Sequence, residues 1–195
     1  MRGVSASRVA AALVVALALA GCTTLSEREC KSADWEAIGR DDGARGATPS
    51  KLARHRETCA LYGVKPEEQA WQAGYAQGLV SYCTPAGGYV AGRDGEGDHR
   101  LCAGRPQEPA FLEALRHGQE VGVLLREVRA LRRALRDTEM AALAGNRGAT
   151  EEAQLNMQVV ELRAALAAKL WELGRLDGEY AVKFGAKPLE PSEPR

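Results

Sequence analysis

Apolar positions recur at spacings of three and four residues over much of the C-terminal half, a pattern typical of helices that pack along one face. The first run consists of Val121, Leu124, Val128, Leu131 and Leu135. The second run consists of Leu155, Val159, Leu162, Leu166, Leu173, Leu176 and Tyr180. The sequence GNRG at residues 145–148 separates the two runs. We therefore expect an antiparallel, coiled-coil-like helical hairpin over residues 106–185.

Start and stop signals predict three shorter helices before this hairpin. Ser26 and Glu29 match a capping box, in which a hydroxyl and a carboxylate accept hydrogen bonds from the first free amides. The later starts are Thr48-Pro49 and Pro66-Glu67-Glu68. The predicted helices cover about residues 26–43, 49–63 and 66–83. Residues 84–105 are rich in glycine and follow a Thr-Pro pair, so we expect an ordered loop there. The predicted fold is mainly α, with a small disulfide-stapled helical head over residues 22–105.

The N-terminus has the pattern of a secretory signal. A basic start precedes an uninterrupted apolar run over residues 9–20. This run is shorter than the roughly 20 apolar residues of a spanning helix. It ends in LAGC at residues 19–22, which resembles the lipobox of bacterial lipoproteins. The resemblance implies removal of residues 1–21 and attachment of acyl chains such as palmitate to Cys22. Thr23, in place of an aspartate, implies an outer-membrane lipoprotein that faces the periplasm.

Four cysteines remain once Cys22 is set aside, and we expect them to form disulfides. An even count in an exported protein favours two bridges, which three connectivities would satisfy. Helices that run down, up and down would place Cys30 and Cys59 at one end and Cys83 at the other. Bridged Cα atoms lie within about 7 Å, whereas a helix of about 17 residues is roughly 25 Å long. This geometry favours the pairs Cys30–Cys59 and Cys83–Cys102.

Aromatic residues precede glycines spaced three or four apart in the head. Trp35 precedes Gly39 and Gly43, and Trp71 precedes Gly74 and Gly78. Glycine within a helix costs about 1 kcal/mol relative to alanine, so we interpret these pairs as places where two backbones approach closely. The alternative is a small-ligand groove lined by five aromatic side chains. They are Trp35, Trp71, Tyr75, Tyr82 and Tyr89.

These same stretches resemble a known family. CKSADWEAIGRDDGARG, LARHRETCALYGVKPE and YAQGLVSYCTPAGGYVAGRDG, followed by Cys102, are similar to a family of small bacterial envelope lipoproteins. That family is catalogued as a domain of unknown function. The resemblance covers about residues 22–103. It implies no established activity and no catalytic residues.

Composition and motifs argue against several kinds of chemistry. The chain has 26 basic and 26 acidic residues, so it lacks the strong positive charge expected of a nucleic-acid-binding protein. None of the three histidines (His55, His99 and His117) lies in a nucleophile motif, and the wide cysteine spacing does not suit a zinc site with His99. A calcium loop over Asp94, Glu96 and Asp98 would lack its turn glycine. A paired-carboxylate hydrolase could use Asp34, Asp41 or Asp42, but spacing alone does not establish one. We therefore expect no enzymatic activity, no metal and no cofactor.

Arginines form a ridge on the outward positions of the first hairpin arm. They are Arg126, Arg129, Arg133 and Arg136. Such a ridge is either a solvated face or a contact for an anionic surface or acidic partner. We expect a non-catalytic, lipid-anchored envelope protein that binds a protein partner, or another copy of itself, through residues 109–185. The alternative is a protein that binds cell-wall glycan or a small molecule through the aromatic–glycine head. Residues 186–195, with three prolines, are expected to form a disordered tail.

Overall fold

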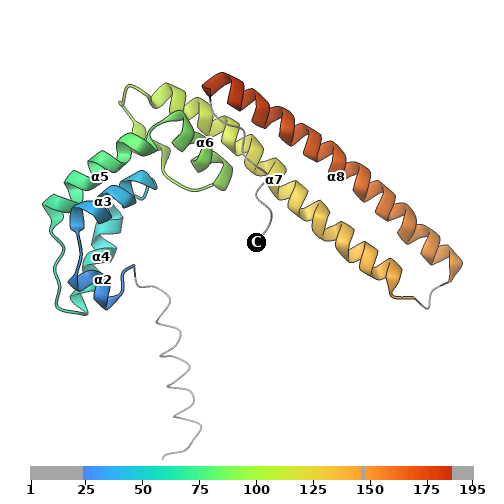
Figure 1. Cartoon of the computed structure of the whole chain (residues 1–195), viewed down its shortest axis with the longest axis horizontal. Coiled ribbons are helices and arrows are strands. Elements are labelled where there is room, and N and C mark those ends of the chain that lie inside the picture. Colours follow the sequence, from blue (N-terminus) through green and yellow to red (C-terminus); the bar gives the residue numbers. More distant parts are fainter. Residues whose placement is uncertain (1–23, 146–147, 186–195) are drawn as a thin grey trace, which may run out of the picture. The chain divides into compact units, whose positions relative to one another are not determined.

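A computed structural model describes residues 24–145 and 148–185 (Figure 1). The described residues form α-helices and one short 3₁₀ helix, and no strand occurs among them. The helices are α2 (Glu27–Lys31), α3 (Trp35–Ala44), α4 (Ser50–Ala60), α5 (Glu68–Tyr82), α6 (Pro85–Asp94), η2 (His99–Cys102), α7 (Glu108–Leu143) and α8 (Ala149–Phe184). The predicted mainly α class is confirmed. The chain divides into two compact units within α5, with unit 1 ending at Gly78 and unit 2 beginning at Leu79.

Unit 1 contains two helices where the sequence predicted one over residues 26–43. The capping box at Ser26 is present, because the Ser26 side chain accepts from the Glu29 amide and the Glu29 carboxylate accepts from the Ser26 amide. The helix that it starts ends after Lys31. Asp34 then caps a new helix, accepting a hydrogen bond of 2.9 Å from the Ala37 amide. The prediction of one continuous helix is wrong because Asp34 offers the backbone a second start.

Glycines bring α3 and α5 into backbone contact. A Cβ atom added to Gly39 would lie 2.0 Å from the Trp71 carbonyl oxygen. A Cβ atom added to Gly74 would lie 1.9 Å from the backbone carbonyl oxygen of Glu36, and one added to Gly78 would lie 2.1 Å from that of Arg40. No side chain fits at these distances. The interpretation of the helical glycines as points of close approach is therefore confirmed in unit 1.

The described residues contain two disulfides, one in each unit. Cys30 is bonded to Cys59 and Cys83 to Cys102, with Cα–Cα distances of 5.5 and 5.4 Å. All four cysteines are buried. These are the pairs that the predicted order of helices favours. The bridges span 29 and 19 residues, and closed loops of this size contribute about 3 kcal/mol each by the chain-entropy argument.

The first helix that lies wholly within unit 2 is one that the sequence did not predict. Residues 84–105 were expected to form a loop, but Pro85–Asp94 is α6 and His99–Cys102 is η2. The Thr84 side chain accepts a hydrogen bond of 3.1 Å from the Gly87 amide, and Pro85 occupies the first turn. The Thr-Pro pair thus ends α5 and also starts α6. The loop prediction is wrong here because a Thr-Pro pair is both a stop and a start signal.

The glycines of α6, like those of α3 and α5, allow the backbones of two helices to come into contact. Cβ atoms at Gly88 and Gly92 would lie 2.3 and 2.0 Å from carbonyl oxygens of α7. In the opposite direction, Cβ atoms added to Gly118 and Gly122 of α7 would lie 2.2 and 2.5 Å from carbonyl oxygens of α6. A helix that looks too rich in glycine for its length is therefore stabilised by packing against α7.

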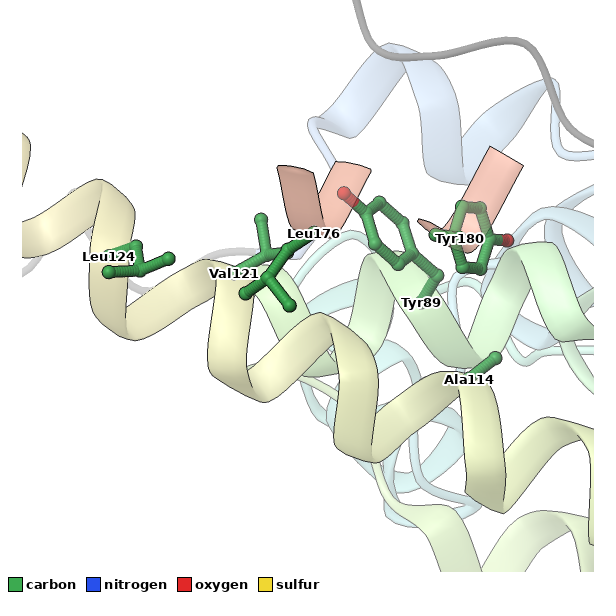
Figure 2. Packing of buried hydrophobic residues seen from close by; sticks show 6 residues of the cluster. All are labelled: Tyr89, Ala114, Val121, Leu124, Leu176 and Tyr180. Atoms are coloured by element: carbon green, nitrogen blue, oxygen red, sulfur yellow. The ribbon is translucent and has the colours of Figure 1, made fainter. Parts of the chain in front are cut away.

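Helices α7 and α8 run antiparallel beside each other and form the predicted hairpin (Figure 1). Each has 36 residues, which corresponds to about 54 Å. Every residue of the two predicted apolar runs is buried or half-buried. A cluster of buried residues joins α6 to the open end of the hairpin. Its members are Tyr89, Ala114, Val121, Leu124, Leu176 and Tyr180. Figure 2 shows Tyr89 and Tyr180 side by side, with Val121 and Leu176 next to them. The heptad prediction is confirmed.

Several predicted features lie outside the described residues. They are the signal peptide over residues 1–21, the lipidation site at Cys22 and the disordered tail over residues 186–195. Of the helices that the structure describes, none has the length and apolar character needed to cross a bilayer.

Candidate functional site

A buried polar network lies at the centre of unit 1. Asp42 on α3 and His55 on α4 are each only 2% exposed. The Asp42 Oδ2 atom lies 2.8 Å from His55 Nε2 and accepts a second hydrogen bond of 3.0 Å from Trp71 Nε1 on α5. Three helices of the unit therefore meet at one carboxylate oxygen.

The network continues to the first described residue of the chain. His55 Nδ1 lies 2.9 Å from the Thr24 hydroxyl. That hydroxyl also lies 3.2 Å from the Thr58 hydroxyl, and the Thr24 amide donates to the same Thr58 oxygen at 3.4 Å. Thr24 can thus donate to one neighbour while it accepts from the other. The segment before α2 is held to α4 by these contacts.

Electrostatics keep Asp42 ionised. Burial raises its pKa, but the hydrogen bonds from His55 and Trp71 and the electrostatic attraction of His55 and Lys51 together outweigh burial and lower the pKa below its ordinary value. The other carboxylate oxygen, Oδ1, lies 3.5 Å from the Arg45 guanidinium, which is largely exposed. Because a carboxylate only accepts hydrogen bonds, His55 Nε2 carries a proton.

A pocket of about 350 Å³ lies beside this network. Its walls come from the segment before α2 and from α2, α3 and α4, and they are mostly polar or charged. They include Thr24, Glu29, Asp34, Asp41, Lys51 and His55. The order hydroxyl, imidazole, carboxylate is the one that activates a hydroxyl nucleophile in hydrolases. Here the hydroxyl is already held between His55 and Thr58, so its visible role is to fasten residue 24 to the unit.

The five aromatic candidates for a ligand groove are all buried. Trp35, Trp71 and Tyr75 belong to the core of unit 1, where the rings of Trp71 and Tyr75 stack at 4.6 Å. Tyr82 and Tyr89 belong to the core of unit 2. All five side chains pack in the cores of the two units, and none of them lines the pocket beside Asp42.

A second polar cluster lies among the rings of unit 2. Tyr89 donates a hydrogen bond of 2.9 Å to Asp177. Burial is the main reason that the pKa of Tyr89 is raised, and the hydrogen bond to the Asp177 carboxylate is the second. His117 Nε2 lies 2.8 Å from the Leu176 carbonyl oxygen, and the Tyr180 ring stacks on Tyr89 at 4.0 Å. These contacts lock α6, α7 and α8 together at the open end of the hairpin.

The remaining candidates of the sequence analysis are separate from these clusters. Asp94 and Asp98 form ion pairs with Arg93 and Arg100. No group of three potential metal ligands occurs in the described part of the chain. The arginine ridge of α7 is exposed along its length, and none of its four members forms an ion pair with a described residue. Its prediction as an outward face is confirmed.

Sequence reasoning named Asp42 and His55 but did not connect them. Thr24 lies 31 residues before His55, and Asp42 lies 13 residues before it, on a different helix. No motif links residues at such distances. The signal that was present is the burial-prone Trp71, whose indole N–H requires an acceptor inside the core.

The described residues define a small, mainly helical protein with two internal disulfides and a long helical hairpin. Residues 34–120 match a family model described as "Protein of unknown function (DUF2799)". The resemblance to a family of unknown function is thereby confirmed for this segment, which begins at the cap of α3 and ends within α7. The match begins 12 residues after the predicted start at residue 22 and ends 17 residues after the predicted end at residue 103, so it includes Gly118 of the α6–α7 contact. No curated protein and no solved structure matches the chain.

Proposed function

We propose that this protein is a lipoprotein of the bacterial cell envelope, anchored through Cys22 in the outer membrane and facing the periplasm. The lipobox-like LAGC motif and the preceding apolar run support this proposal. The two disulfides agree with an oxidising compartment. Thr24 follows Cys22 by two residues and contacts His55 and Thr58. These contacts would hold unit 1 close to the lipid anchor.

Metabolic labelling with a palmitate analogue tests the anchor. The full chain should incorporate the label and sediment with membranes, and Cys22→Ser should lose both properties. Thr23→Ala is the matched control and should keep the label. Label retained by Cys22→Ser, or no label on the unaltered chain, would contradict the proposal.

We further propose that the hairpin is a non-catalytic module for protein interaction. The observation that carries this proposal is that α8 exposes large apolar side chains away from its contacts with α7. Met157, Val160 and Trp171 are 61%, 65% and 71% exposed. Scattered exposed apolar residues are normal, but a row of them along one helix marks an interaction surface.

Photo-crosslinking in living cells tests the module. A photoreactive amino acid at position 171 should give discrete adducts of identifiable mass, whether with another protein or with a second copy. The same amino acid at Gln158, an exposed polar position of the same helix, is the matched control and should give none. Equal crosslinking at both positions, or none at position 171, would contradict the proposed role.

A further inference from the structure

Helix α8 carries a second apolar stripe that the hairpin does not use. The stripe consists of apolar and small residues spaced three and four apart, exposed from residue 157 to residue 174 and half-buried at Gly178 and Ala181. Its members are Met157, Val160, Ala164, Ala167, Trp171, Gly174, Gly178 and Ala181. The inner seam, which includes Val159, Leu166 and Leu173, lies on the opposite side of the helix. One helix therefore presents two heptad seams, and α7 covers only one of them.

The glycines of the outer stripe have no structural reason within one chain. In α3, α5, α6 and α7, a Cβ atom at most of the helical glycines would collide with a neighbouring backbone. At Gly174 and Gly178, a Cβ atom would meet nothing within 4 Å. Each costs the helix about 1 kcal/mol relative to alanine. Elsewhere in this protein that cost accompanies a close helix contact, so the stripe has the composition of a helix interface without its partner.

We propose that a second copy of this chain covers the stripe, with the two α8 helices antiparallel about a twofold axis at Lys169. This inference rests on the proposed role of the hairpin as an interaction module and names its partner. A twofold pairing uses the same surface on both copies, so that surface must be complementary to itself. The outer stripe meets this requirement in size and in charge.

The sizes of the side chains alternate correctly about this axis. The axis lies at the level of Lys169, whose own side chain pairs with Glu127 of α7. The three larger residues (Met157, Val160 and Trp171) each face a small residue of the other copy, and two small residues face each other in the remaining pair. The facing pairs are Met157 with Ala181, Val160 with Gly178, Ala164 with Gly174 and Ala167 with Trp171. The Trp171 ring would therefore have a methyl group opposite it. The contact would extend over about 37 Å of helix.

The charges beside the stripe select the same arrangement. In this pairing Glu161 of one copy and Arg175 of the other lie on the same flank of the stripe, two residues (about 3 Å along the helix) from being level, and the twofold axis repeats the pair. Glu161 is exposed and forms no ion pair with a described residue. Arg175 is about half exposed and pairs within its own helix with Glu179. A shift of one heptad in either direction separates Glu161 from Arg175, so charge fixes the register as well as the direction.

Cysteine crosslinking of the full chain, isolated in mild detergent, tests the direction and the register. Ala168→Cys places a thiol beside the axis and should give a disulfide-linked dimer on mild oxidation. Gln158→Cys, on the polar side of α8, is the matched control and should stay monomeric. Ala164→Cys and Gly174→Cys should each give little dimer alone and a linked dimer when mixed. Dimers of Ala164→Cys alone with none in the mixture would overturn the antiparallel arrangement.

Sedimentation of the uncrosslinked chain tests the energetics. Trp171→Glu should raise the dimer dissociation constant by about 100-fold or more, with unchanged circular dichroism as the check that the hairpin still folds. Glu161→Arg should raise the constant about tenfold, and the double variant Glu161→Arg/Arg175→Glu should restore it to within about threefold. Failure of the double variant to recover would refute the charge pairing.

The outcomes also separate this inference from the proposed function. A chain that stays monomeric at all concentrations and gives no Ala168→Cys dimer would overturn the second copy as partner. If position 171 nevertheless crosslinks to a different protein in cells, the interaction module stands with another occupant. If neither experiment gives an adduct, both proposals fail.

Discussion

Removing the charge of Asp42 should destabilise unit 1, because this carboxylate joins three helices. In Asp42→Asn the side chain keeps its shape and loses its charge. The bonds from His55 Nε2 and Trp71 Nε1, at 2.8 and 3.0 Å, both end on Oδ2. A hydrogen bond to a charged group contributes about 1.5–3 kcal/mol and a neutral one about 1 kcal/mol, so losing the charge weakens two bonds by roughly 1 kcal/mol each.

A further loss arises if the new amide group faces either donor. A buried donor left without an acceptor costs about 1–3 kcal/mol. We therefore expect Asp42→Asn to lower the free energy of unfolding by about 2–4 kcal/mol at pH 7. Asp41→Asn is the matched control, since Asp41 is the neighbouring residue, is largely exposed and pairs with the exposed Arg45. It should change stability by less than about 0.5 kcal/mol.

Lowering the pH should reduce the difference in the free energy of unfolding between the unaltered chain and Asp42→Asn. The pKa of Asp42 is lowered in the folded protein, so its stabilising contribution is complete above the ordinary aspartate pKa of about 4. The contribution is lost as the pH falls through the lower folded pKa. The asparagine variant has no such group to titrate. The gap in stability should therefore be largest above about pH 4 and should narrow below it.

Urea unfolding followed by tryptophan fluorescence measures this gap, because Trp35 and Trp71 are buried in unit 1. Titrations at pH 7, 5 and 3 give the free energy of unfolding for the unaltered chain and both variants. A loss below 0.5 kcal/mol for Asp42→Asn, or a loss equal to that of Asp41→Asn, would refute the role assigned to the network. A gap that stays constant down to pH 3 would refute the assigned ionisation.

Three further changes follow from the packing and are measured by thermal and urea unfolding. Gly74→Ala should lower the free energy of unfolding by at least about 2 kcal/mol, because its Cβ would lie 1.9 Å from the Glu36 carbonyl oxygen. An unchanged free energy of unfolding would mean that α3 and α5 can move apart without loss of stability. Replacing both cysteines of the Cys83–Cys102 bridge by serine should cost about 3 kcal/mol, and an unchanged melting temperature would contradict that value. Tyr89→Phe should cost about 1.5 kcal/mol through loss of its bond to Asp177, whereas a change within 0.5 kcal/mol would show that the bond contributes little.

Local patterns were sufficient for the elements whose signals lie close together in the chain. The heptad runs predict both arms of the hairpin, because the spacing of apolar residues is set by the helical repeat itself. The Ser26 capping box is confirmed for the same reason, since its two partners are three residues apart. The disulfide pairs followed from helix length, which is also a local property.

Local patterns failed where one signal has two meanings. Thr84-Pro85 ends one helix and starts another, and the sequence alone did not distinguish a loop from α6. The glycines there suggested irregular structure because glycine weakens an isolated helix. Their partners in α7 lie more than 20 residues away, and only the packed structure shows that Gly92 and Gly118 stabilise the contact.

The sequence by itself determined the helical class, the hairpin, the cysteine pairing and a candidate anchor at Cys22, because each depends on composition, short spacings or helix length. Only the tertiary structure joined Thr24, His55 and Asp42, since no periodicity relates residues on three separate segments. It also decided which seam of α8 faces α7. The chain contains two apolar stripes on that helix, and only packing shows that Leu176 is covered while Trp171 is left exposed.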